Sequence, residues 1–150
     1  MEPLTEFYGA LVKDMMIDLG LYESSTYSWV FWVQMNNSET STHTTHHHFR
    51  GGEIASWVHF LQVPEEERSF YFQTDRGPIF PEEQLSNTVV AFPPWRPHGV
   101  KPLKKKNFDR YIVAGNITLN TLSPINATHP FLSQSMREDG LQVTWDLSFS

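Results

Sequence analysis

Apolar residues recur at helical spacing through the first part of the chain. Positions three and four residues apart lie on one face of an α-helix, so this pattern predicts an amphipathic helix. The glycine at position 20 follows the last of them as a stop signal. The apolar positions are Leu4, Phe7, Tyr8, Leu11, Val12, Met15 and Leu19.

From residue 26 the apolar pattern changes to a period of two, which is typical of β-strands. Within 26–35, Tyr27, Trp29, Phe31, Val33 and Met35 alternate with the residues between them. Turn-rich pieces separate the later candidate strands, and segment 120–140 has no readable pattern. One helix followed by short strands predicts a mainly β fold, a double-stranded β-helix or jelly roll. The later candidate strands are 54–63, 69–75, 87–92, 110–119 and 141–149.

Composition narrows the setting of this fold. A length of 150 residues predicts a single domain over 1–150 with a core of its own. The chain has no cysteine, which excludes disulfides, thiolate metal sites and thiol nucleophiles. A net charge of −6 argues against nucleic acid as a partner. No membrane-length apolar stretch and no signal peptide are visible, so we expect a cytoplasmic protein without a membrane partner.

Histidines supply the candidate chemistry, because four of the seven stand between positions 43 and 48. In a strand, His46 and His48 share a face and can bind one ion while His47 points away. A solvated polar turn is the alternative for this segment. A third ligand must come from elsewhere, and His98 follows an apolar strand where prolines fix the backbone. That arrangement is the one expected at the mouth of a β-barrel.

Three blocks in order resemble a small family of 2-oxoglutarate/Fe(II)-dependent oxygenases that is common in marine bacteria and their phages. They are SWVHFLQVPEEERSFYF, TVVAFPPWRPHGVKP and DRYIVAGNI, within about residues 26 to 119. The resemblance implies that Fe(II) and 2-oxoglutarate are bound and that a substrate C–H bond is hydroxylated with O2. Succinate and carbon dioxide are the expected co-products.

The resemblance also assigns roles to residues of this chain. His46 and His48 stand where the first metal ligands belong, and His98 stands at the distal ligand. Arg110 would bind the distal carboxylate of 2-oxoglutarate, since its planar fork grips a carboxylate bidentately. Alternation puts Asn116 on the same strand face, beside the pocket.

Two positions depart from the family pattern. No carboxylate stands next to the histidines, so the ion has either three histidines or Glu53 as a further ligand. A tyrosine of the family strand is replaced by His59, which either donates to 2-oxoglutarate or is a satisfied core histidine. The lysines at 104–106 are read as a solvated turn.

Two other classes of function compete with the oxygenase. The spacing of His46, His48 and Glu53 fits a cupin-type metal protein: an isomerase, another dioxygenase or a sugar-binding module. A β-sandwich interaction protein without enzymatic activity is the third hypothesis. For an oxygenase, the substrate stays unidentified, with a peptidyl residue suggested only by analogy, and loops 36–53 and 74–87 would carry specificity. The sequence does not indicate an oligomeric state.

Overall fold

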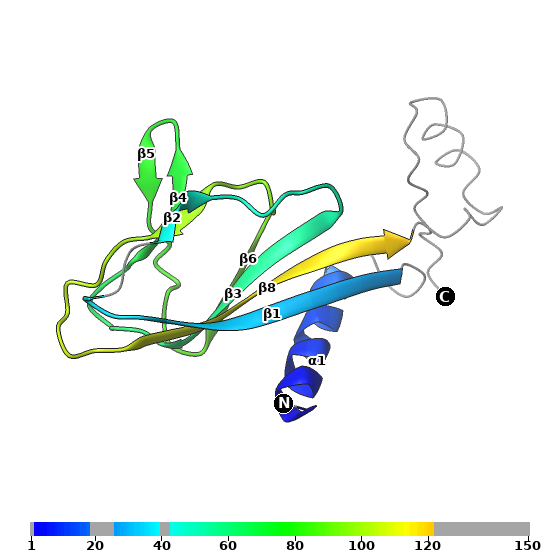
Figure 1. The fold of residues 1–150 in the computed structure, drawn as a ribbon, viewed down its shortest axis with the longest axis horizontal. Coiled ribbons are helices and arrows are strands. Elements are labelled where there is room, and N and C mark those ends of the chain that lie inside the picture. The colour runs from blue at the N-terminus through cyan, green and yellow to red at the C-terminus, as the bar shows by residue number, and fades with distance from the viewer. Residues whose placement is uncertain (1, 19–25, 40–42, 122–150) are drawn as a thin grey trace. The chain divides into compact units, whose positions relative to one another are not determined.

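The computed structural model describes residues 2–18, 26–39 and 43–121 (Figure 1). One helix precedes eight strands in this part of the chain. The elements are α1 (Glu2–Asp18), β1 (Thr26–Asn36), β2 (His43–His46), β3 (Glu53–Gln62), β4 (Phe70–Thr74), β5 (Gly77–Ile79), β6 (Thr88–Phe92), β7 (His98–Val100) and β8 (Arg110–Thr121).

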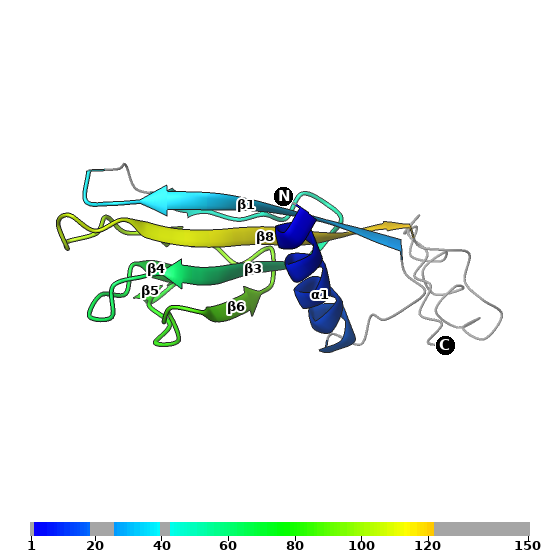
Figure 2. The same cartoon turned by 90° about the horizontal axis from the view of Figure 1, so that it is seen from below.

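The strands form two four-stranded sheets, with the orders β1-β8-β3-β6 and β2-β7-β4-β5. Figure 2 shows the strands of the first sheet side by side in this order. The pairs β2–β7, β3–β6, β4–β5 and β4–β7 are antiparallel. Because the chain passes back and forth between the two sheets, the topology is that of a jelly roll. The predicted fold class, a jelly roll after an N-terminal helix, is confirmed.

The chain divides into two compact units, residues 1–29 with 117–150 and residues 30–116. In the first unit, α1 buries Tyr8, Val12 and Met16, which are spaced by four residues along one helix face. Leu4 and Phe7, which the periodicity also placed on the buried face, are 42% and 54% exposed. The buried stripe of this helix is therefore narrower than the sequence predicts, and a single domain stays a prediction.

The second unit has its core between the two sheets. Val58, Phe60 and Phe92 come from one sheet, and Phe70 and Val100 from the other. Burying a side chain of this size stabilises the fold by about 1.5–3 kcal/mol. The core cluster consists of Val58, Phe60, Val63, Phe70, Phe92, Val100, Ile112 and Ala114.

Gly115 marks a close approach between β8 and the indole of Trp57. A Cβ at this position would lie 2.5 Å from Cε2 of Trp57 and 2.7 Å from the carbonyl oxygen of Val30. Neither distance is compatible with van der Waals contact, so only glycine fits here without a shift of the indole. A glycine inside a strand can have this meaning.

Short strands were harder to predict than long ones. The predicted strands 26–35, 54–63, 69–75, 87–92 and 110–119 match β1, β3, β4, β6 and β8 to within a few residues. The strands β2, β5 and β7 were missed, because three or four residues that include glycine, proline or histidine do not establish an alternating pattern. The predicted strand 141–149 lies outside the described residues. No helix in the described ranges is long and apolar enough to cross a membrane.

Candidate metal centre

The pairing of β2 with β7 brings His46 and His98 together. His46 is the last residue of β2 and is the register partner of His98, the first residue of β7. His48 follows β2, and its backbone N–H donates to the carbonyl oxygen of Pro94 at 2.8 Å. That bond ties the segment after β2 to the proline-rich turn before β7. Two segments about 50 positions apart in sequence are thereby held side by side.

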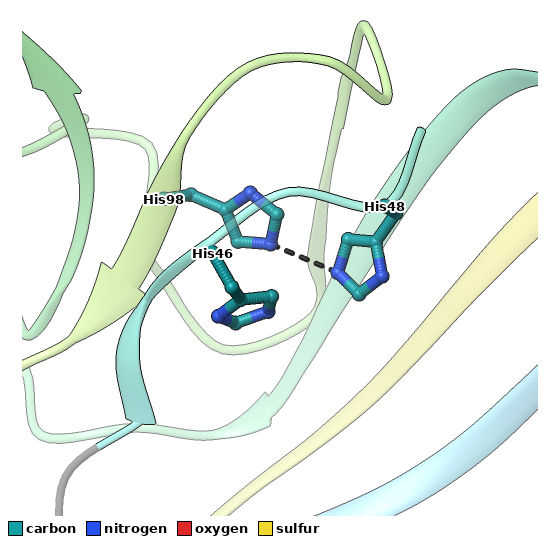
Figure 3. Close-up of side chains that lie close together, drawn as sticks. All are labelled: His46, His48 and His98. Atoms are coloured by element: carbon teal, nitrogen blue, oxygen red, sulfur yellow. Dashed lines mark hydrogen bonds between the residues drawn. The ribbon is translucent and has the colours of Figure 1, made fainter. Parts of the chain in front are cut away.

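The three imidazoles point toward one another (Figure 3). One ring nitrogen of each lies within 4.8 Å of the other two. The Nε2 atoms of His48 and His98 are 3.0 Å apart. Nitrogens that share an ion at about 2.0–2.1 Å lie roughly 3–3.5 Å apart. The separation of His48 and His98 already fits a shared ion, and the His46 ring would have to move closer where its separation exceeds that range. His98 is buried, while His46 and His48 are half-buried.

Backbone carbonyls fix the orientation of two of these rings. Nδ1 of His46 lies 2.7 Å from the carbonyl oxygen of Thr44, and Nδ1 of His98 lies 2.8 Å from that of Arg96. A carbonyl only accepts, so in both neutral imidazoles Nδ1 carries the proton and Nε2 keeps its lone pair. Metal-binding histidines commonly have such a partner on the second ring nitrogen.

His48 has a different outer partner, the side-chain amide of Asn116. Nδ2 of Asn116 lies 3.5 Å from Nδ1 of His48, and Oδ1 of Asn116 accepts from Oγ of Ser56 at 2.7 Å. In this arrangement Nδ1 of His48 accepts, so its Nε2 carries the proton and donates it to His98. Coordination through that Nε2 requires the proton to move to Nδ1 and the amide to turn, so that its oxygen accepts.

Burial and, to a lesser extent, the neighbouring His46 lower the pKa of His48 to about 4. The ring is therefore neutral at pH 7. Neutral imidazole is the form that binds a metal ion.

A cavity of about 270 Å³ opens beside the three histidines, within residues 30–116. Both sheets contribute to its walls, which are mostly apolar away from the imidazoles. The lining residues are Trp32, Gln34, His46, His48, Ser56, Trp57, Val58, Phe70, Phe92, His98, Val100, Ile112, Ala114 and Gly115.

Arg110 begins β8 and is one of the most buried side chains, with 1% of its surface exposed. Its Nη1 donates to Oδ1 of Asn36 at 3.4 Å, a long hydrogen bond. The same oxygen accepts from Nε2 of Gln34 at 2.9 Å, and Gln34 lines the cavity. Alternation puts Ile112 and Ala114, which also line the cavity, on the β8 face of Arg110.

The charge of Arg110 is not compensated in the described part of the chain. Its Nη2 has no hydrogen-bond partner there, and no described carboxylate forms an ion pair with it. The guanidinium carbon lies 5.8 Å from the centre of the Phe60 ring, within range of a weak cation–π interaction. Burial lowers the pKa of Arg110 to about 10, so the group is still charged at pH 7.

The remaining predicted residues lie apart from this cluster. The carboxylate of Glu53 accepts from the backbone N–H groups of Arg50, Gly51 and Gly52 at 2.7, 3.0 and 3.2 Å. These bonds lower its pKa against the opposing effect of burial, and they assign it a role in the loop rather than in the cluster. His47 is exposed.

His59 lies on the strand face opposite to the cavity. Its neighbours Val58 and Phe60 pack in the core between the sheets, whereas Nε2 of His59 lies 3.2 Å from Oδ1 of Asn87. The geometry therefore corresponds to the second alternative, a core histidine with a polar partner, and gives the ring no contact with the cavity.

Sequence reasoning missed several polar groups around the site. Ser56 and Asn36 hold the side chains of Asn116 and Arg110, and the carbonyls of Thr44 and Arg96 orient two imidazoles. The alternation within β3 could have indicated Ser56, which shares a face with Val58. The backbone carbonyls leave no signal in the sequence.

Comparison with known proteins finds similarity to solved structures. No family model and no curated protein matches this chain. A prolyl-4-hydroxylase from Pseudomonas putida is similar with a TM-score of 0.49 and 16% identity, over 71% of this chain. The matched region spans 60% of the length of that protein. The assignment of function therefore rests on the site itself.

Proposed function

We propose that this chain is an Fe(II)- and 2-oxoglutarate-dependent oxygenase that hydroxylates a substrate C–H bond. The observation that carries this proposal is the buried guanidinium of Arg110, whose Nη2 has no partner among the described residues. It lies on the strand face that also lines the cavity beside the three histidines. A metal protein without an anionic cosubstrate would leave Nη2 of Arg110 without a partner among the described residues.

The donor set fits an iron ion. His46, His48 and His98 would hold it through neutral nitrogens, which suit Fe(II) among other first-row metals. Three neutral ligands leave the ion with its full double positive charge, and a dianionic cosubstrate would neutralise that charge. Iron with 2-oxoglutarate and O2 supplies oxidative hydroxylation, with succinate and carbon dioxide as co-products.

Arg110 would hold the far carboxylate of 2-oxoglutarate. A guanidinium binds a carboxylate through two parallel N–H bonds, and Nη2 is available in the described residues for one of them. The apolar side chains of Val58, Ile112 and Ala114 line the cavity and would limit the access of water to a bound cosubstrate. In such surroundings a charge pair is stronger than at the surface. In this proposal Arg110 orients the cosubstrate, the apolar lining limits the access of water, and the histidines hold the ion.

One observation favours a second candidate, a cupin-type metal protein. The cluster consists of three histidines without a carboxylate, a donor set that also suits zinc and copper. That candidate leaves the unpartnered nitrogen of Arg110 without a role.

Thermal unfolding under nitrogen separates the candidates. A ligand that binds only the native state stabilises it, by about 2.7 kcal/mol at a hundred times its Kd. We expect Fe(II) to raise Tm, and 2-oxoglutarate to raise it further only when iron is present. Pyruvate is the matched control, since it has the 2-oxo acid group without the far carboxylate, and its effect should be much smaller.

Other outcomes of this experiment would contradict the oxygenase or the role of Arg110. A shift with iron that 2-oxoglutarate does not increase would favour the cupin-type protein. No shift with iron, zinc or copper would leave the non-enzymatic β-sandwich. Equal shifts with pyruvate and 2-oxoglutarate would remove Arg110 from the binding site.

A further inference from the structure

Two large aromatic side chains are exposed beside the metal centre. Phe49 directly follows His48, and Trp95 stands three positions before His98. They are 45% and 61% exposed, and their rings meet edge to face with centroids 6.3 Å apart. An exposed tryptophan with an aromatic neighbour is a common anchor of binding surfaces. Phe49 and Trp95 are called the aromatic pair below.

The backbone holds the aromatic pair and the histidines together. The N–H of His48 donates to the carbonyl of Pro94, next to Trp95, at 2.8 Å. The N–H of Arg96 donates to the carbonyl of Pro93 at 3.0 Å, which closes the turn, and the Pro94 ring is fully buried. A group that rests on the aromatic pair is therefore held at a fixed place relative to the three imidazoles.

Positive charge accompanies the aromatic pair. Arg50 follows Phe49, Arg96 follows Trp95, and both arginines are exposed. The nearest acidic side chain in sequence is Glu53, whose Oε2 accepts from three backbone N–H groups. A chain of net charge −6 thus carries two exposed cations that each follow a member of the aromatic pair in sequence. Arginine beside aromatic rings recognises a carboxylate next to an apolar group.

The size of the cavity indicates where the substrate lies. At about 270 Å³ it is just below the range of roughly 300–1,000 Å³ for small-molecule sites. If 2-oxoglutarate occupies it, the group to be hydroxylated must approach from outside, and the aromatic pair is an exposed apolar surface that the backbone ties to the histidines. An open surface can bind a substrate polypeptide that presents one of its residues to the iron. Strand β2, which leads to the histidines, is an edge strand in the described sheet, and an edge can pair with an extended polypeptide.

We propose that the aromatic pair, with Arg50 and Arg96, docks an extended polypeptide segment in which an apolar residue stands beside one or two carboxylates. This inference rests on the proposed oxygenase function. Two cations on a chain of net charge −6 match one or two carboxylates better than the many phosphates of a nucleic acid strand.

The test uses the full-length protein loaded with iron and 2-oxoglutarate under nitrogen. Three fluorescein-labelled probes of equal length are titrated by anisotropy: a pool of peptides with an apolar residue flanked by glutamates, the same pool with lysines, and an oligothymidylate. We expect the glutamate pool to bind best, and Trp95→Ala and Arg96→Gln each to weaken it by about tenfold. Trp95→Phe should recover part of the affinity.

Matched controls exclude general effects of losing surface apolarity or charge. Ile79→Ala removes an equally exposed apolar group from β5, and Lys106→Gln removes an exposed cation elsewhere, so neither should change probe binding. No binding of the glutamate pool at millimolar concentration, equal binding by Trp95→Ala, or preference for the lysine pool or the oligothymidylate would each overturn the proposal.

The two proposals fail separately in this design. Trp95→Ala should keep the Tm shifts with iron and 2-oxoglutarate, because it contributes no atom to the cavity lining. Normal shifts without selective peptide binding contradict only the docking surface. Absent shifts in the wild type contradict the oxygenase, whatever the probes do.

Discussion

The histidine cavity and the groove beside the lysine turn differ in size and in how their charges are compensated. The groove, of about 900 Å³, is lined by Glu66, Glu67, Arg68, Phe80 and residues 101–105. The cavity is less than a third of that volume, about 270 Å³. Size alone would select the groove as the functional site.

Several charges of the groove, those of Glu66, Glu67 and Lys105, already have partners within the chain. Nζ of Lys105 lies 2.9 Å from Oε1 of Glu66, and the carboxylate of Glu67 accepts from the N–H groups of Lys104 and Lys105 at 2.6 and 3.2 Å. By contrast, Arg110, which shares a β8 face with the cavity-lining residues Ile112 and Ala114, is buried with Nη2 unpartnered in the described residues. A buried, uncompensated charge destabilises a fold. An unsatisfied buried group is therefore a stronger indication of a binding site than a large hollow.

Removal of two histidines should have the largest effect, because it should abolish metal binding beside the cavity. In the double variant His46→Ala, His48→Ala, only one of the three clustered ligands is left, which cannot hold an ion against water. We expect the metal content after loading and desalting to fall to background, as measured by elemental analysis. His47→Ala, which changes the exposed neighbour, is the matched control and should bind normally. Unchanged occupancy in the double variant would point to a different ligand set.

Arg110→Ala should have the next largest effect, on the cosubstrate alone. Loss of one partner of a buried charge pair costs about 2–5 kcal/mol, so 2-oxoglutarate binding should weaken by that amount while iron binding is nearly unchanged. Titration of the iron-loaded protein under nitrogen measures both. Equal 2-oxoglutarate affinity in wild type and variant would favour the cupin-type protein.

Arg110→Met tests, through the stability of the metal-free protein, whether the buried charge has a structural role. An apolar side chain of similar length removes the buried charge without leaving a large hole, and such replacements are often neutral or stabilising. We expect Tm of the metal-free protein not to fall in this variant, although 2-oxoglutarate no longer binds. A large fall in Tm would mean that the guanidinium stabilises the fold through a structural partner and does not serve to bind a ligand.

A smaller effect is expected at Asn116, which contacts only one of the ligands. Asn116→Ala removes the outer partner of His48, and such losses typically lower metal affinity by about tenfold or more. Asn116→Asp should bind metal at least as well as the wild type, because a carboxylate accepts the Nδ1 proton that the metal-binding form of His48 carries. Competition with a chelator gives both affinities. Loss of affinity in both variants would exclude this orienting role.

The sequence predicted the long elements of the fold and the residue types of the site. His46 and His48 were named from their spacing, and His98 from its place after an apolar strand. The structure brings the three together, while metal binding itself stays a prediction. The register of β2 against β7 could not be predicted, since strands of three or four residues have too few side chains to set a pattern.

Other features depend on tertiary structure that no local pattern contains. The charge of Arg110 is uncompensated because no described residue near it in space partners Nη2, which the sequence does not reveal. The role of Glu53 depends on how the loop at residues 50–52 folds back on its carboxylate. The side of the sheet on which His59 lies was readable in principle: Val58 and Phe60 flank it, and alternation puts it on the opposite face from both.

Lys105→Ala should have the smallest effect, and it tests the other half of the comparison. The Lys105 and Glu66 side chains are 42% and 63% exposed, so water screens their ion pair and no ligand depends on it. We expect unchanged affinities for iron and 2-oxoglutarate.

The hydrogen bond from Lys105 lowers the pKa of Glu66. Its small stabilising contribution is therefore present above the ordinary pKa of a glutamate and is lost as the pH falls through the lowered value. Chemical unfolding of both proteins should give free energies that differ slightly at neutral pH and converge in acid. A loss of 2-oxoglutarate binding in Lys105→Ala would mean that the lysine groove, and not the buried arginine, receives the cosubstrate.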